Sequence, residues 1–264
     1  MDDKKKLLER IRLFVLDMDG TFYLGEQLYK GSLGFIDKVL ATNRRFLFFT
    51  NNSSRTPELY IKKLARMGLD IDRSGIMTSG DVMIEYLNKH YRGSSVYLMG
   101  TEALKQDFSA RGIALTEDRQ PDVVVVSFDT ELTYAKLERA CSYIRNGAVF
   151  LATHLDINCP TETGFIPDCG SFCAAIELST GQKPRYLGKP FPETLEMIVS
   201  VTGTAKEEIA FIGDRLYTDV ATGVNGGAYG ILVLSGETSL EDVECSEIKP
   251  HAIFADLEEI ALYL

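Results

Sequence analysis

The sequence predicts a doubly wound α/β protein, in which helices cover a parallel sheet and a second α/β domain interrupts the first. Short apolar runs alternate with helical patterns along the chain, which is the order expected of strands joined by crossover helices. Residues 46–49 are continuously apolar, as suits a strand buried on both faces, and polar residues 50–54 follow them. The same order returns after a middle block. We therefore expect a core at 1–81 and 184–264 and an inserted domain at 82–183.

The first part of the chain supplies two strands and three helices. Apolar positions spaced three and four apart predict the helices, and apolar runs predict the strands. Pro57 begins the third helix, because proline is tolerated at a first helical position, and Gly68 ends it. The expected elements are a helix at 4–11, a strand at 12–17, a helix at 32–42, a strand at 46–49 and a helix at 57–67.

The middle and last parts continue the alternation. In the middle block we expect helices at 81–90, 102–111, 133–145 and 171–179, strands at 95–99, 123–126 and 148–152, an irregular loop at 153–169 and a linker at 181–184. In the last part we expect a helix from Pro192, a strand at 209–213, a helix at 216–224, a strand at 230–234, a polar turn, a strand at 252–254 and a helix at 256–263.

The composition is that of an ordinary globular protein, with 45% apolar and 25% charged residues. The formal net charge of −10 argues against nucleic acid as the natural partner, because a phosphate backbone requires a basic surface. A small anion can still bind in a local positive pocket. The five cysteines are scattered and odd in number, which free thiols in a reducing cytoplasm explain most simply.

The N-terminal segment resembles a secretion signal only superficially. Its apolar run is short, is broken by Glu9, Arg10 and Arg12, and ends in acids. No apolar stretch approaches the ~20 residues that cross a bilayer. We therefore expect a cytoplasmic protein with no membrane partner.

The most informative stretch is the octapeptide at 14–21, where an apolar run ends in two carboxylates and a glycine. Side chains two apart on a strand share a face, so Asp17 and Asp19 are expected to point the same way. Gly20 permits a turn at no steric cost. Two crowded acids repel each other unless a cation or a reaction requires them. An acidic turn is the alternative for the octapeptide taken alone.

Four polar clusters lie at comparable places, each after an expected strand or in a loop that opens a helix. They are Asp17/Asp19, Thr50-Asn51-Asn52-Ser53, Gly188-Lys189-Pro190, and the segment from Gly213 to Asp219. Together these clusters resemble the four motifs of the haloacid dehalogenase-like (HAD) phosphatases. The TNNSSR run, the GKP before a proline-capped helix and the mid-chain insertion are similar to the NagD-like, or p-nitrophenylphosphatase-like, branch. The resemblance covers essentially the whole chain.

The resemblance implies a Rossmann-like, HAD-like core with an inserted type-two cap, and a Mg²⁺-dependent phosphatase. The substrate is then a small phosphorylated metabolite. A carboxylate can attack phosphorus to form a mixed anhydride, and its neighbour can serve as acid and base. The shared face does not say which acid does which. The family pattern makes Asp17 the nucleophile and Asp19 the proton shuttle.

The resemblance also implies a metal site and a phosphate site. Asp17, the backbone carbonyl of Asp19 and Asp214 would hold Mg²⁺, which prefers oxygen ligands, and Asp219 would orient Asp214 or a water. For Asp214 the structural alternative is a helix N-cap. The phosphate donors would be Thr50 with Asn51 and Asn52, although the same residues can simply cap the next helix.

Lys189 and Arg215 receive different expectations. A lone lysine is normally a solvated surface residue, but the place of Lys189 in the GKP motif implies that it balances the charge of the phosphoryl group and of Asp17. The family motif assigns no role to Arg215, and we expect it at the surface.

In the cap, the resemblance makes the loop after residue 152 a candidate specificity loop. His154, Asp156 and Asn158 alternate, so they can face a substrate together. A solvent-facing loop is the alternative. Zinc bound by His154 with Cys159, Cys169 and Cys173 is disfavoured, because the spacing matches no standard finger. A homodimer formed through the cap is compatible with the resemblance.

Other functions are weaker fits. Mutases of the superfamily usually carry a cap after the first motif, whereas this insertion follows the second. A receiver-like signalling domain also uses Asp, Mg²⁺, Thr and Lys, but it has no inserted domain and its phosphorylated Asp follows a later strand. A non-catalytic phosphate-binding module would not need all four motifs. Sugar phosphates, nucleoside monophosphates, phosphoglycolate and pyridoxal phosphate all remain open as substrates.

Overall fold

The computed structural model describes residues 2–161 and 163–264. Met1 belongs to the expected core and Glu162 to the expected loop at 153–169, and both lie outside the described residues. The chain divides into two units. The first unit comprises the residues up to Thr50, Ile61–Met77 and Lys189–Leu264, and the second comprises Asn51–Tyr60 and Thr78–Gly188.

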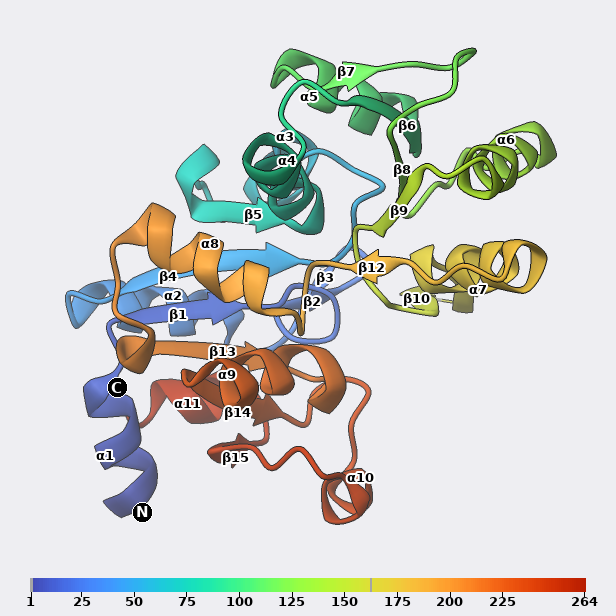
Figure 1. Cartoon of the computed structure of the whole chain (residues 1–264). Helices are drawn as coiled ribbons and strands as arrows, with labels where there is room; N and C mark the ends of the chain where they lie inside the picture. Colours follow the sequence, from blue (N-terminus) through green and yellow to red (C-terminus); the bar gives the residue numbers. More distant parts are fainter. Residues whose placement is uncertain (1, 162) are drawn as a thin grey trace. The chain divides into compact units, whose positions relative to one another are not determined.

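The first unit contains a six-stranded sheet (Figure 1). Its strands, in spatial order, are β15 (Ala252–Phe254), β14 (Tyr229–Val233), β13 (Ile209–Gly213), β1 (Leu13–Leu16), β4 (Arg45–Thr50) and β5 (Ile76–Thr78). The pairings from β15 to β4 are all parallel, and Leu16 lies opposite both Ile212 and Phe48. The carboxyl ends of β13, β1 and β4 therefore meet at one edge of the sheet.

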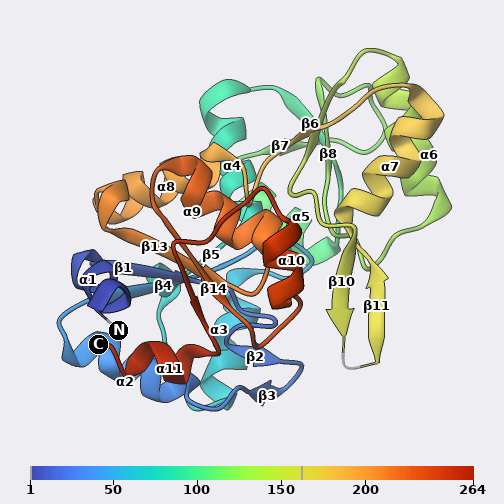
Figure 2. The same cartoon turned by 90° about the horizontal axis from the view of Figure 1, so that it is seen from below.

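Helices cover both faces of this sheet. Figure 2 shows the pair α8 and α9 on one side and the pair α2 and α11 on the other, and each pair is in contact. The helices of this part of the chain are α1 (Asp2–Arg10), α2 (Ser32–Ala41), α3 (Pro57–Arg66), α8 (Pro192–Thr202), α9 (Ala221–Gly226), α10 (Leu240–Cys245) and α11 (Leu257–Ala261). With every residue of β1 and β13 buried, the double cover explains why these strands are apolar throughout.

The second unit is built on a five-stranded parallel sheet. Its strands, in spatial order, are β12 (Arg185–Tyr186), β9 (Val149–Ala152), β8 (Val123–Val126), β6 (Ser95–Met99) and β7 (Ala114–Leu115). The helices are α4 (Ser79–His90), α5 (Glu102–Ala110), α6 (Tyr134–Arg145) and α7 (Cys169–Thr180). An antiparallel hairpin of β10 (Asn158–Thr161) and β11 (Gly164–Pro167) precedes α7.

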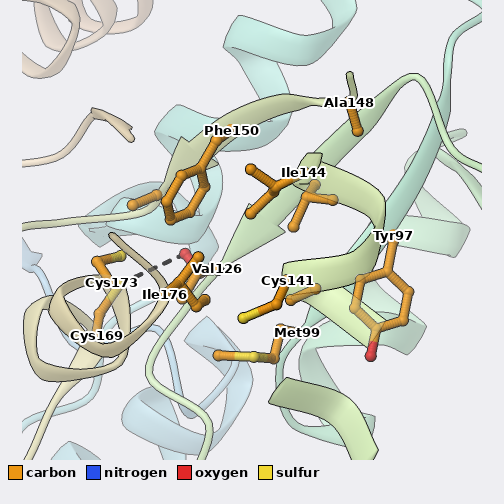
Figure 3. Packing of buried hydrophobic residues seen from close by; sticks show 13 residues of the cluster. Tyr97, Met99, Val126, Cys141, Ile144, Ala148, Phe150, Cys169, Cys173 and Ile176 are labelled. Carbon is orange, nitrogen blue, oxygen red and sulfur yellow. Dashed lines mark hydrogen bonds between the residues drawn. The ribbon is translucent and has the colours of Figure 1, made fainter. Parts of the chain in front are cut away.

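The core of the second unit lies between its sheet and the pair α6 and α7, as Figure 3 shows. Tyr97 and Val126 reach this core from the strands, and Cys141 reaches it from α6. Cys169, at the start of α7, contributes a thiol that donates to the carbonyl oxygen of Val126 at 3.4 Å. Cys141, Cys169 and Cys173 are thus part of the buried core of this unit.

The expected fold, a doubly wound core interrupted by a second α/β block, is confirmed. The strand expected at 123–126 and the strand expected at 209–213 are both observed with those bounds. Several short elements were not predicted, namely the hairpin of β2 (Tyr23–Leu24) and β3 (Gln27–Leu28), the strands β5, β7 and β12, the hairpin β10–β11 inside the expected irregular loop, and helix α10 inside the expected polar turn. Two or three residues carry too little periodicity to reveal a strand.

The helix expected at 216–224 is wrong in detail. The chain first makes a π-helical turn, Leu216–Val220, and becomes α-helical only in α9. π-Helical turns are rare and are found frequently at functional sites. Here the turn carries Asp219, which lies at the edge of the sheet described below. None of the helices in the described residues is long and apolar enough to cross a membrane.

Candidate active site

The motif residues of the first unit meet at the carboxyl edge of its sheet. Asp17 directly follows β1, and its N–H donates to the carbonyl of Ile212 at 2.9 Å, which extends the pairing with β13. Asp214 directly follows β13, and Asp219 lies in the π-helical turn after it. Adjacent parallel strands end together, so residues nearly 200 positions apart in sequence become neighbours.

Lys189 lies at the centre of this group, with its side chain only 3% exposed. Its ammonium donates to Asp17 Oδ1, to Asp219 Oδ1 and, at 3.1 Å, to the carbonyl of Phe49 near the end of β4. Burial would lower the pKa of Lys189, but the charges of Asp17 and Asp219 outweigh burial and hold the pKa above its usual value. The lysine is thus a buried cation, and the alternative of a solvated surface lysine is excluded.

Asp17 is the most accessible member of the group, with a side chain 13% exposed. Burial and then the negative charges of Asp219 and Asp214 raise its pKa well above the ordinary aspartate value, although Lys189 opposes them. One lysine therefore does not balance three clustered carboxylates. Additional positive charge at the site would stabilise the ionised form of Asp17.

Asp214 is almost fully buried and is held from several directions. Its Oδ2 accepts the backbone N–H of Glu237 at 2.8 Å, and the hydroxyl of Thr21 lies 3.4 Å from its Oδ1. Burial and then the charge of Asp219 raise the pKa of Asp214 to about 6, while the Glu237 amide and Arg215 oppose this rise. Backbone and side-chain groups therefore hold the Asp214 carboxylate in place. These contacts are more than a helix N-cap alone would supply.

Two motif glycines explain how the carboxylates come so close to the backbone. Gly20 has φ +89°, and a Cβ there would overlap Asp214 Oδ2. A Cβ at Gly213 would overlap the carboxyl carbon of Asp219. Both glycines are thus required for close packing, and Gly20 is required for its positive φ as well.

The carboxylates of Asp17, Asp214 and Asp219 fit the requirements of a cation site. One oxygen from each lies within 4.8 Å of the others. The set is oxygen-only and carries excess negative charge, which suits a hard divalent ion. Asp19 is half-buried beside this group, with its backbone bridged to Tyr23 in β2.

The Thr50–Asn52 motif is divided between the two units. Thr50 is the buried last residue of β4, one position after Phe49, so it lies at the same edge of the sheet as Asp17. Asn51 and Asn52 belong to the second unit, where Asn51 Nδ2 donates to Asp156 Oδ2 at 3.0 Å. Asn52 Oδ1 accepts from the Ser54 N–H at 3.0 Å and from its hydroxyl at 2.7 Å, which is an Asx-type turn.

The structure separates Asn158 from the other two residues of the expected specificity loop, His154 and Asp156. His154 is fully buried, with Nε2 2.9 Å from Asp168 Oδ1 and Nδ1 2.9 Å from the Thr153 hydroxyl. Asp156 is also buried, whereas Asn158 is exposed on β10. Burial opposes protonation of His154, but Asp168 together with Cys169 and Asp156 outweighs burial, and these neighbours raise the histidine pKa to about 9.

The group His154, Asp156 and Asp168 is therefore an ion-pair network. One ligand-type atom from each lies within 4.8 Å of the others. The raised pKa of His154 favours the protonated ring, which would pair with Asp168. All five cysteines are free thiols, and Cys141, Cys169 and Cys173 are buried.

Sequence reasoning missed three residues of these networks. Asp168 falls in the expected irregular loop but is the N-cap of α7, and a capping acid before a helix was the available signal. Arg215 was expected at the surface, yet its side chain is 13% exposed and its Nε lies 2.9 Å from Glu237 Oε2. No sequence pattern connects Arg215 with Glu237.

Comparison with known proteins agrees with this geometry. Residues 14–114 match the family model described as haloacid dehalogenase-like hydrolase, and residues 186–260 match a second model described as HAD-hydrolase-like. An acid sugar phosphatase of Staphylococcus aureus is 34% identical over 252 residues, which cover 96% of this chain and 97% of that protein. The chain belongs to the haloacid dehalogenase-like hydrolase family.

Solved structures narrow the resemblance to one branch. The 4-nitrophenylphosphatase of Thermotoga maritima is 47% identical with a TM-score of 0.93, and the match covers 97% of this chain and 98% of that one. NagD of Escherichia coli is 30% identical with a TM-score of 0.87, covering 94% and 98% of the two chains. The resemblance to NagD-like and p-nitrophenylphosphatase-like proteins inferred from the motifs is confirmed.

Proposed function

We propose that this hydrolase is a phosphatase that cleaves small phosphate monoesters through an aspartyl-phosphate on Asp17. The observation that carries the proposal is the buried Lys189, which bonds to both Asp17 and Asp219 at the carboxyl edge of the sheet. A fixed ammonium beside a partly exposed carboxylate is an arrangement that can bind a phosphoryl group and present a nucleophile to it.

The proposed reaction has two steps. In the first, a carboxylate oxygen of Asp17 attacks phosphorus, the bond from phosphorus to the ester oxygen breaks, and Asp19 gives the leaving alcohol its proton. In the second, Asp19 takes a proton from water, the water oxygen attacks phosphorus, and the bond to Asp17 breaks. Inorganic phosphate leaves, and Asp17 and Asp19 return to their starting states.

The remaining motif residues would bind charge. Lys189 would offset the negative charge of the phosphoryl group, and Thr50 with the amides of Asn51 and Asn52 would hold its oxygens. Thr50 ends a strand at the same edge as Asp17, which supports its part in this set. Asn51 and Asn52 follow it directly in the chain.

Asp17, the carbonyl of Asp19 and Asp214 would hold Mg²⁺, which when bound would supply positive charge to the phosphoryl oxygens and to Asp17. Asp219 would act as a supporting residue. Its Oδ1 accepts from Lys189, and its Oδ2 accepts from the Thr218 hydroxyl at 3.1 Å, so both of its oxygens have protein partners.

For the substrate, sugar phosphates deserve the first test, because the Staphylococcus aureus relative is named an acid sugar phosphatase. Within the second unit, Asn158 is the exposed one of the three expected specificity residues and is the one available to a ligand.

We also propose a cytoplasmic location, consistent with five free thiols in the described structure. The receiver-like alternative is disfavoured, because the match to phosphatases extends across both units.

Purified protein assayed with p-nitrophenyl phosphate and a panel of sugar phosphates tests the proposal. We expect release of inorganic phosphate with Mg²⁺, loss of activity with EDTA, and recovery on adding excess Mg²⁺. Activity indifferent to chelation would contradict the metal role. A folded protein that hydrolyses no phosphate monoester would contradict the function.

A further inference from the structure

Residues 235–238, called the strap below, connect β14 to α10 and cross directly over Asp214. The Glu237 N–H donates to Asp214 Oδ2 at 2.8 Å, and the Thr238 N–H donates to the Asp214 carbonyl at 3.2 Å. The Ser235 hydroxyl donates to the carbonyl of Gly20 at 3.0 Å. The strap therefore contacts both the last motif, at Asp214, and the first motif, at Gly20.

The strap can approach this closely because it has a glycine at its centre. A Cβ at Gly236 would overlap Asp214 Oδ2 and crowd the rest of that carboxylate. Gly20 contacts the same carboxylate, so Asp214 is enclosed between two glycine backbones. The position of the Asp214 carboxylate is therefore tied to the position of the strap.

An ion pair fastens the strap to the residue after Asp214. Arg215 Nε lies 2.9 Å from Glu237 Oε2, with the two side chains 13% and 43% exposed. The guanidinium carbon also lies 6.0 Å from the centre of the Tyr217 ring. Glu237 thus uses its backbone N–H to hold Asp214 and its side chain to hold Arg215, and the three groups form one closed set of contacts.

We propose that Arg215 and Glu237 are positioning residues that orient Asp214 toward the cation. This inference rests on the proposed function, in which Asp214 is a metal ligand. Partners that hold a ligating carboxylate commonly change metal affinity by 10- to 100-fold when they are removed. An ion pair with a half-exposed partner contributes little to folding stability, so its main effect here is on the orientation of Asp214.

The test is direct Mg²⁺ binding by titration calorimetry, without substrate, for the full-length wild type and for Glu237→Gln, Arg215→Gln and the double variant. Glu258→Gln is the matched control. It removes an ion pair to Lys30 of similar length, 3.0 Å, from a side chain of similar exposure, 45%, in the same unit. Circular dichroism and the unfolding midpoint establish that each variant is folded, and Arg215→Lys tests rescue by retained charge.

We expect each single variant to bind Mg²⁺ at least about 10-fold more weakly than the wild type. The double variant should bind Mg²⁺ no more weakly than the weaker-binding of the two single variants. The Mg²⁺ concentration for half-maximal activity should shift in parallel, and Glu258→Gln should match the wild type. If wild type binds Mg²⁺ and Glu237→Gln binds it equally well, the inference is overturned while the proposed function stands. If Arg215→Gln raises only the KM for p-nitrophenyl phosphate, Arg215 contacts substrate and the positioning role is wrong. A wild type that binds no Mg²⁺ contradicts the metal role itself.

Discussion

At the scale of single residues, the candidate active site is a balance between burial and charge. Asp17, Asp214 and Asp219 are crowded together with one ammonium, from Lys189, among them. Burial raises the pKa of Asp17 and Asp214, so the acids resist ionisation until positive charge is added. The same arrangement that costs stability without a cation would give the site its affinity for one.

A second buried charge balance lies in the other unit. The His154 imidazole lies between Asp168 and the hydroxyl of Thr153 and is fully buried. Cys169 and Asp156 also act on its pKa, and Ser79 is within 3.4 Å of its Nδ1. The net effect of these neighbours is to favour the protonated ring.

This balance predicts a pH dependence of stability. With a pKa of about 9 in the folded chain and about 6.5 in the unfolded chain, the contribution of His154 is complete below pH 6.5 and is lost as pH rises through 9. A shift of roughly 2.5 pH units corresponds to about 3 kcal/mol. The free energies of unfolding of wild type and His154→Gln should be measured in urea at pH 6 and at pH 10. We expect the wild type to be more stable than the variant at pH 6, and we expect this difference in stability to shrink at pH 10. Parallel pH profiles for the two proteins would exclude a titrating His154.

At the scale of elements, predictability follows the length and burial of each segment. Val123–Val126 and Ile209–Gly213 are strands buried throughout, so their apolar runs reveal them directly. The hairpin β10–β11 is largely exposed, and its strands have no apolar face for a pattern to mark. Helix α10 is short and has no buried residue, so only its capping box, Ser239 with Asp242, distinguishes it from a turn.

The turns that carry the motifs are more constrained than the helices around them. Gly20→Ala places a Cβ against Asp214 at a positive φ, and we expect a loss of roughly 1–3 kcal/mol in the free energy of unfolding. Gly34 is the matched control, because it lies inside α2 and a Cβ added there would meet nothing within 4 Å. Gly34→Ala should stabilise by about 0.5–1 kcal/mol. Equal effects of the two changes in urea unfolding would contradict the close packing of Gly20 on Asp214.

At the scale of the whole molecule, the carboxylates and the lysine of the site come from three separated stretches of the chain. The sequence alone groups four of these residues, Asp17, Lys189, Asp214 and Asp219. Each lies in a motif that follows an expected strand or opens a helix, and parallel strands end at one edge of a sheet. The pairs Arg215–Glu237 and His154–Asp168 could not. They depend on how loops pack after folding, which leaves no periodic signal in the sequence.

The net charge of −10 is also a property of the whole molecule. A strongly acidic protein repels phosphorylated metabolites at long range, so binding must depend on local positive charge. Within the first unit that charge includes the buried ammonium of Lys189, and it would include a cation held beside Asp17 and Asp214. Specificity for phosphate is therefore expected at the carboxyl edge of the sheet.

Asp17 is the residue expected to carry the phosphoryl group during turnover. Asp19→Asn should slow the second step more than the first with p-nitrophenyl phosphate, because p-nitrophenolate leaves with little need of a proton. Acid quenching during turnover would trap the acyl phosphate, and borohydride would reduce it to homoserine. Peptide mass spectrometry would then locate the homoserine in the chain. We predict homoserine at position 17 only when substrate is present, and none in Asp17→Asn. Turnover with no modification at position 17, or with modification at another residue, would contradict the account.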